Sequence, residues 1–202
     1  MKREGLTIIL SAPSGAGKTS LCRELFKIFP DIKESVSFTT RHPRVGEIEG
    51  EAYHFVTNEE FISMVDEDAF AEWAVVHGNM YGTALKTLEE ARKSGVDLVL
   101  DIDCQGALKL KEQFDSGIYV FILPPSMEEL RRRLESRSSD SQEVIEQRIL
   151  RASDEIKESR WYDFIVINDS FEVAIQELAS IVTAHRRKTF RMMEQVGKLF
   201  DI

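Results

Sequence analysis

The sequence contains only two cysteines, Cys22 and Cys104, among its 202 residues. They are too few for a disulfide framework, and they match no metal-ligand spacing. We therefore expect two buried, inert thiols and a chain that folds without disulfide bonds. Cysteine usage of this kind is typical of a reducing compartment, so we expect a cytoplasmic protein.

The sequence also lacks long apolar runs and an excess of positive charge. No stretch approaches the roughly 18 to 20 apolar residues of a membrane-spanning helix, and the apolar run in MKREGLTIIL is too short for a signal peptide. Acidic side chains outnumber basic ones by 35 to 26, which gives a formal net charge of −9. This acidity argues against a protein that coats nucleic acid. We expect no membrane and no nucleic-acid partner, and any phosphate binding must be local.

What the sequence does contain is an alternation of short apolar runs and charged segments with helical spacing. The runs predict buried parallel strands at residues 6–10, 97–102, 118–123 and 164–167. A helix is predicted at 18–29, where Pro30 ends the apolar spacing. The length favours one compact unit with an insertion. The pattern predicts an α/β fold with a mostly parallel sheet flanked by helices.

Three segments depart from the alternation. Residues 36–82 predict a small inserted lobe, with strands at 36–38, 53–56 and 70–76 and a helix at 58–65. Residues 126–159 predict two charged helices around the turn SRSSDS, a hairpin that is able to move. Residues 171–200 predict one long helix, and residues 184–202 are expected to form a basic, helical extension beyond the core. For this extension we favour a solvated helix or a homo-oligomer contact over an acidic partner.

A glycine-rich loop joins the first strand to the first helix. The segment APSGAGKT matches the pattern G-x-x-x-x-G-K-[ST], except that alanine replaces the first glycine. Glycines let backbone N–H groups turn around phosphate oxygens at a helix N-terminus, where Lys18 can bridge two phosphates and the Thr19 hydroxyl can hold Mg²⁺. An incidental glycine turn would not need this strand and helix around it. The loop predicts a nucleoside triphosphate site made of Ala12, Pro13, Ser14, Gly15, Ala16, Gly17, Lys18 and Thr19.

The acceptor is left open by this loop, because switches, motors and small-molecule kinases share it. A second motif, FTTRHPRVGEIEGEAYHF at residues 38–55, places Arg41 and Arg44 in a polar, turn-rich segment. Arginine forks grip phosphate oxygens with two hydrogen bonds, and Tyr53 and Tyr81 can add phenolic ones. Two arginines on a polar loop ordinarily lie on the solvated surface, so the pair alone does not establish a phosphate-binding site.

The neighbours of these arginines resemble the nucleotide-monophosphate lobe of guanylate kinases, T-T-R-x-x-R-x-G-E-x-x-G-x-x-Y-x-F. The resemblance extends through the phosphate loop and covers residues 5–183, including FAEWAVVHGNMYGT, LDIDCQGA, FILPPS, RRRLESR and EQRI. It implies a P-loop nucleoside monophosphate kinase with a GMP-binding lobe at 36–82 and a lid at 126–159. Such an enzyme transfers the γ-phosphoryl group of ATP to GMP with Mg²⁺, so ATP and GMP are the expected partners.

The resemblance also implies roles for matching residues. The GMP phosphate is expected to meet Ser37, Arg41, Arg44, Tyr53 and Tyr81. The guanine base is expected to face Glu72, Thr83 and Asp103, since guanine offers two N–H donors to carboxylates and an O6 acceptor to a hydroxyl. Adenine lacks that donor pair and would leave the carboxylates unpaired. The expected lid arginines over the triphosphate are Arg133, Arg137 and Arg148.

Asp101 and Asp103 follow a predicted strand, and taken alone they could simply cap the next helix. Ligands bind at the carboxyl ends of strands in such sheets, so Asp101 is expected to orient Mg²⁺ through water. With the resemblance, the expected catalytic set is Lys18, Arg41, Asp101, Arg137 and Arg148.

Two other functions remain open at this point. One is a non-catalytic binding module of the same fold, which would show decay of the phosphate loop, whereas Lys18 and Thr19 are present here. The other is a kinase for a different phosphorylated acceptor, such as a ribose bisphosphate. Such a kinase has no reason to keep Glu72, Thr83 and Asp103 together, so guanine is favoured.

Overall fold

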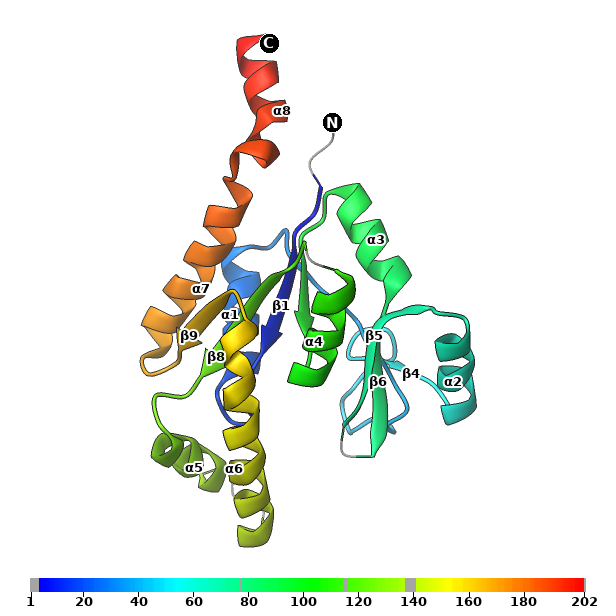
Figure 1. Cartoon of the computed structure of the whole chain (residues 1–202), viewed down its shortest axis with the longest axis vertical. Helices are drawn as coiled ribbons and strands as arrows, with labels where there is room; N and C mark the ends of the chain where they lie inside the picture. The colour runs from blue at the N-terminus through cyan, green and yellow to red at the C-terminus, as the bar shows by residue number, and fades with distance from the viewer. Residues whose placement is uncertain (1–3, 77, 115, 137–140, 202) are drawn as a thin grey trace.

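The computed structural model describes residues 4–76, 78–114, 116–136 and 141–201. Its centre is a five-stranded sheet of order β2-β7-β1-β8-β9, in which every neighbouring pair is parallel (Figure 1). The strands are β1 (Thr7–Ser11), β2 (Lys33–Glu34), β7 (Leu98–Asp101), β8 (Ile118–Leu123) and β9 (Phe164–Ile167). The predicted α/β fold with a mostly parallel sheet is confirmed.

Helices cover both faces of this sheet. On one face lie α1 (Lys18–Ile28) and α7 (Phe171–Arg186), and on the other α3 (Leu85–Ser94), α4 (Cys104–Gln113) and the short 3₁₀ turn η1 (Glu158–Trp161). Successive side chains of a strand point to opposite faces, so Ile8 and Leu10 enter the first core and Ile9 the second. The strands β1, β7 and β8 are buried on both faces, which is why they read as continuous apolar runs. The edge strand β9 was also predicted to be buried, but Ile165 and Ile167 are exposed because no further strand or helix of the described residues covers them.

A second sheet forms the predicted lobe. Its strand order is β4-β3-β6-β5, with β3 (Phe38–Thr39), β4 (His54–Phe55), β5 (Phe70–Val76) and β6 (Asn79–Ala84). The helix α2 (Asn58–Asp66) begins with a capping box made by Thr57 and Glu60. The strand β6 was not predicted, because NMYGTA shows no apolar alternation. Backbone pairing with β3 on one side and β5 on the other stabilises it.

Two charged helices, α5 (Met127–Glu135) and α6 (Gln142–Lys157), form the predicted hairpin. They share a small apolar core of Leu130, Leu134, Ile145 and Ala152. In Figure 1 the lobe and this hairpin lie on opposite sides of the lower edge of the sheet, where β1 ends. The carboxyl ends of the central strands therefore lie between the lobe and the hairpin.

The C-terminal segment is not one long helix, so that prediction is wrong. The helix α7 ends at Arg186 and α8 (Thr189–Phe200) begins after Lys188, whose ψ of 138° is extended. The side chain of Arg186 is held by Asp97 and Asp31 at 2.7 and 2.8 Å, which anchors the last turn of α7.

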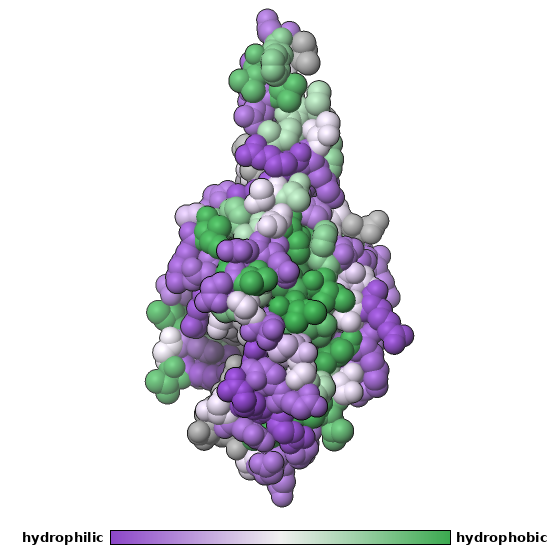
Figure 2. Space-filling view, turned by 90° about the vertical axis from the view of Figure 1, so that its left-hand side faces the viewer, coloured by the Kyte–Doolittle hydropathy of each residue, from purple (hydrophilic) through white to green (hydrophobic). Residues whose placement is uncertain are grey.

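The helix α8 stands clear of the body, and Figure 2 shows apolar side chains along it at the top of the molecule. None of its described residues is buried, and Phe190, Leu199 and Phe200 are among its exposed apolar side chains. Within the described ranges, no helix combines the length and the apolar character needed to cross a membrane.

Candidate active site

The phosphate loop lies between the end of β1 at Ser11 and the start of α1 at Lys18. Gly15 and Gly17 have φ angles of 99° and 100°, in the left-handed region that glycine alone adopts at little cost. The N–H of Ala16 donates to the carbonyl of Pro13 at 3.0 Å, which closes the turn between them. The glycines of the motif are therefore required by the backbone path.

The phosphate loop is fixed by a hydrogen bond from Asn168, a buried residue just after β9. Its Nδ2 donates to the carbonyl of Ala16 at 2.7 Å, and a Cβ added at Gly17 would overlap that nitrogen. Arg133 of α5 donates to the carbonyls of Ala16 and Asn168 at 3.4 and 2.9 Å. Asn168 is not among the site residues predicted from the sequence, although a polar side chain directly after an apolar run was a signal for it.

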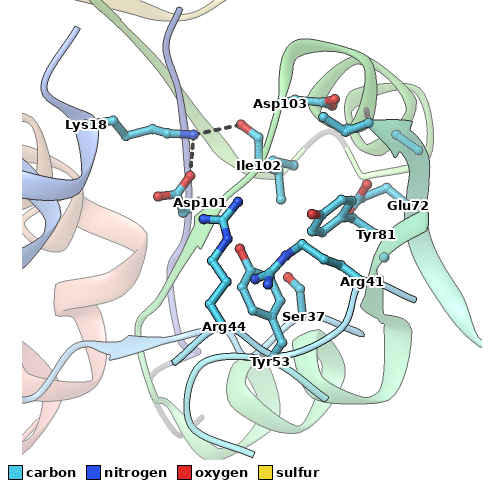
Figure 3. Close-up of a pocket in the computed structure, with 13 residues that line it drawn as sticks. Lys18, Ser37, Arg41, Arg44, Tyr53, Glu72, Tyr81, Asp101, Ile102 and Asp103 are labelled. Carbon is cyan, nitrogen blue, oxygen red and sulfur yellow. Dashed lines mark hydrogen bonds and ion pairs between the residues drawn. The ribbon is translucent and has the colours of Figure 1, made fainter. Parts of the chain in front are cut away.

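The side chain of Lys18 reaches the end of β7. It forms an ion pair with Oδ1 of Asp101 and donates to the carbonyl of Ile102 at 3.3 Å (Figure 3). Burial lowers the pKa of Lys18, but the Asp101 carboxylate outweighs this effect and the pKa is raised. Lys18 is therefore a fixed positive charge at neutral pH.

A cavity of about 260 Å³ opens beside Lys18, between the sheet and the lobe. In Figure 3 Lys18 and Asp101 lie on its left, Glu72 and Asp103 on its right, and the two arginines between them. Nine of the residues predicted from the sequence line it: Lys18, Ser37, Arg41, Arg44, Tyr53, Glu72, Tyr81, Asp101 and Asp103. The fold thus brings together residues that lie up to 85 positions apart, from 18 to 103.

The guanidinium of Arg41 is held by Glu47, which is not among the site residues predicted from the sequence. Nη1 and Nη2 donate to the two carboxylate oxygens at 3.0 and 2.9 Å, while Oε2 also accepts from the backbone N–H of Arg44 at 2.7 Å. These bonds raise the pKa of Arg41 and lower the pKa of Glu47. The guanidinium also lies 5.3 Å from the ring centre of Tyr53, within cation–π range. The sequence signal for this contact was Glu47 itself, the acid that follows Gly46 in RVGEIEG.

At the other end of the cavity, Glu72 of β5 is almost fully buried. Burial raises its pKa to about 7, and the nearby Asp103 adds to the rise, while a hydrogen bond from Thr83 opposes it. Thr83 is itself fully buried and its Oγ1 donates to Oε1 of Glu72 at 2.6 Å, so it contacts the carboxylate and is not a lining residue. Its contact with the base stays a prediction.

Asp103 ends the turn after β7 and caps α4, since its Oδ1 accepts from the backbone N–H of Gly106 at 2.8 Å. The two acids at this strand end therefore differ: Asp101 pairs with Lys18, and Asp103 both caps a helix and faces the cavity. The capping alternative and the ligand-facing alternative are compatible for Asp103.

The remaining predicted residues lie outside the cavity lining. Arg133 contacts the phosphate loop, and Arg148 lies half-buried on α6. Arg137 falls outside the described residues. Among the residues that are described, no group of three or more His, Cys, Asp or Glu side chains could hold a metal ion alone. A Mg²⁺ ion normally keeps few protein ligands and is bound largely by substrate phosphates, so the oxygens of Thr19 and Asp101 match its donor preference.

The chain was compared with known proteins. A family model described as guanylate kinase matches residues 4–185. Two curated guanylate kinases, from Geobacter metallireducens and Geobacter sulfurreducens, are each 60% identical over 202 residues, with full coverage of both chains. The crystal structure of guanylate kinase from Anaplasma phagocytophilum is 35% identical, with a TM-score of 0.78 over 100% of this chain and 98% of that one. The chain belongs to the guanylate kinase family.

Proposed function

We propose that the cavity holds GMP between the sheet and the lobe, and presents its phosphate to ATP bound on the phosphate loop. Membership of the family gives the reaction: the γ-phosphoryl group of ATP passes to GMP, forming ADP and GDP. The observation that carries the proposal is one cavity lined by Lys18 of the loop, Arg41 of the lobe and Glu72. We place the reaction in the cytoplasm, where both nucleotides occur.

The charges of the cavity give GMP its orientation. Arg41 and Arg44, with Ser37, Tyr53 and Tyr81 beside them, offer a phosphate site near Lys18. Glu72 and Asp103 offer carboxylate acceptors at the far end, where the N1–H and N2–H groups of guanine would bind. This orientation places the phosphate against the arginines and the N–H donors of guanine against the carboxylates, whereas the reverse orientation would place the phosphate against the carboxylates.

Transfer of a phosphoryl group requires placement and positive charge more than covalent chemistry. The acceptor is already an anionic phosphate oxygen, so no strong general base is needed. Lys18 neutralises the triphosphate from the loop, and Arg41 neutralises the acceptor from the lobe. Mg²⁺, held by Thr19 and through water by Asp101, would supply further positive charge to the β- and γ-phosphates when bound.

We assign the lid role to the hairpin at 126–159. The contacts of Arg133 with the loop support this, because they already join α5 to the phosphate site. Arg137 and Arg148 are proposed to reach the triphosphate when the hairpin closes. Closure of the hairpin and of the lobe at 36–82 excludes water, which suppresses hydrolysis of ATP.

The direct test is ADP formation from ATP, measured in a coupled assay with GMP, AMP, CMP and UMP in turn. We expect rapid turnover with GMP and little with the others. The absence of GMP-dependent turnover would contradict the proposed reaction. Equal turnover with AMP would contradict the role of the carboxylates in choosing the base.

Replacing Glu72 with glutamine is expected to erode the choice of base. The amide keeps the shape but removes the charge, and turns a donor toward the N–H groups of guanine. Loss of a hydrogen bond to a charged group corresponds to a rise in the KM for GMP of about 30-fold or more. The matched control is Glu59→Gln, an exposed acid on α2, which should leave KM unchanged. A Glu72→Gln variant with wild-type KM and selectivity contradicts the assignment.

The KM for GMP is expected to depend on pH near neutrality. The pKa of Glu72 is raised to about 7, so its neutral form grows as pH falls below that value. A protonated carboxyl cannot accept both guanine N–H bonds, so KM should rise about fourfold between pH 8 and pH 6.5 and level off above about pH 8. The neighbours that act on this charge are Asp103, which raises the pKa, and Lys109, which lowers it.

The measurement is KM for GMP and for ATP between about pH 6.5 and 8.5, above the second phosphate pKa of about 6. The KM for ATP serves as the internal control and should stay flat. In Glu72→Gln the step near neutrality should disappear. A step that persists in that variant shows that another group titrates.

A further inference from the structure

The first turn of α4 lies directly against the carboxylates that we assign to the guanine base. Asp103 caps this helix, and the backbone N–H of Gly106 donates to its Oδ1 at 2.8 Å. The helix packs on β5, the strand that carries Glu72. A single turn of backbone therefore lies within reach of both carboxylates.

Gly106 is a buried residue of this turn, and it lies against both carboxylates. A Cβ added at Gly106 would overlap Oε2 of Glu72, and would lie 3.2 Å from its Cδ and 3.4 Å from Oδ1 of Asp103. Gly106 does not have a positive φ, so its helical backbone would accept alanine, which is the better helix former. The reason for glycine at this position is space for a carboxylate.

Glu72 has little freedom to move away from such a methyl group. Its Oε1 is bonded to Thr83 at 2.6 Å, and only 6% of the residue is exposed. A methyl group at position 106 would therefore break the bond to Thr83 or turn the carboxylate. Either change alters the place where guanine N–H groups would be received.

We propose that Gly106 is a positioning residue for base recognition. The space left by its missing side chain fixes the position of the Glu72 carboxylate, and its backbone N–H fixes the orientation of the Asp103 carboxylate. This inference rests on the proposed function, because it takes Glu72 and Asp103 to be the acceptors of guanine. It adds a residue that does not touch the base and still decides how tightly the base is bound.

The test is Gly106→Ala, assayed as the purified full-length protein. We expect the KM for GMP to rise about tenfold or more, as for a displaced charged hydrogen bond, with the KM for ATP within about twofold. The protein should remain folded with a modestly lower melting temperature, because displacing the buried carboxylate costs more than the helix preference of alanine returns. The control is Gln105→Ala, an exposed neighbour on α4, which should change neither constant. Unchanged KM for GMP in Gly106→Ala overturns the inference.

A second variant separates crowding of the carboxylate from damage to the helix. Glu72→Asp shortens the side chain and makes room for the methyl group. The rise in KM for GMP that Glu72→Asp causes should be smaller when Gly106→Ala is already present than in the unsubstituted protein. The two effects are then not additive. Strictly additive effects overturn the inference. If Gly106→Ala alone does not fold, recovery of folded, GMP-active protein in the double variant supports the inference, and failure to recover contradicts it.

Glu72→Gln distinguishes the two levels of the argument. When Glu72→Gln weakens GMP binding but Gly106→Ala behaves as the unsubstituted protein, only the role of Gly106 is wrong. When Glu72→Gln leaves GMP binding unchanged, the base assignment and the role of Gly106 are both wrong.

Discussion

Replacing Lys18 with methionine is expected to lower kcat by about 10³-fold. The substitution removes the positive charge that would stabilise the phosphoryl group during its transfer. Lys18 is paired with Asp101 and bonded to the carbonyl of Ile102, so its ammonium group is already placed before ATP arrives. No other lysine lines the cavity among the described residues, and the arginines that line it, Arg41 and Arg44, are assigned to the acceptor phosphate. Steady-state rates with saturating ATP and GMP measure the loss.

The matched control is Lys27→Met, on the same helix but with 72% of its side chain exposed, which should keep full activity. The melting temperature of Lys18→Met should also be recorded, because Asp101 then loses its ion pair. A folded Lys18→Met protein with kcat within tenfold of the unsubstituted enzyme contradicts the proposed role of the loop.

Replacing Arg41 with methionine is expected to lower kcat/KM for GMP by about 10³-fold. The positive charge beside the acceptor phosphate is lost, together with the bond that the remaining Nη2 N–H can make to it. Glu47 and the carbonyl of His42 accept the other N–H groups of the two terminal nitrogens, and Tyr53 lies beside them, so the guanidinium is fixed in place. The effect should fall on GMP, while the KM for ATP should remain near its original value.

Arg41→Lys tests the fork separately from the charge. Lysine keeps the positive charge but cannot make the two parallel bonds, so kcat/KM should lie between the unsubstituted and Arg41→Met values. The control is Arg160→Met, an exposed arginine far from the lobe in the sequence, which should be silent. Equal losses with ATP and GMP in Arg41→Met would indicate a general structural defect and would contradict the phosphate assignment.

The parts of this protein that could be read from the sequence are those whose signal is local. The phosphate loop is one, because Gly15, Gly17 and Lys18 must follow each other directly to form a turn at a helix N-terminus. The buried strands are another, because parallel strands covered on both faces need unbroken apolar runs. The residues facing the cavity were identified through family motifs that keep the same spacing.

Local patterns did not reveal contacts between residues far apart in the chain. Asn168 bonds Ala16 from 152 positions away, and Gly106 of the helix α4 borders Glu72 of the strand β5. The strand β6 also escaped prediction, because its stability comes from neighbours on both sides. In the tail, apolar spacing continued through Lys188, while the backbone there left the helix.

The sequence by itself therefore determined the family and predicted the chemistry of the site: a loop for a triphosphate, arginines for a second phosphate and carboxylates for a base. The tertiary structure alone decided how these groups are held. In the folded protein Glu47 binds the guanidinium of Arg41, and Thr83 donates a hydrogen bond to Glu72. The backbone of Gly106 packs against the carboxylate of Glu72. The physical reason is that side-chain types are read from position, whereas their orientation depends on packing and hydrogen bonds between separate elements.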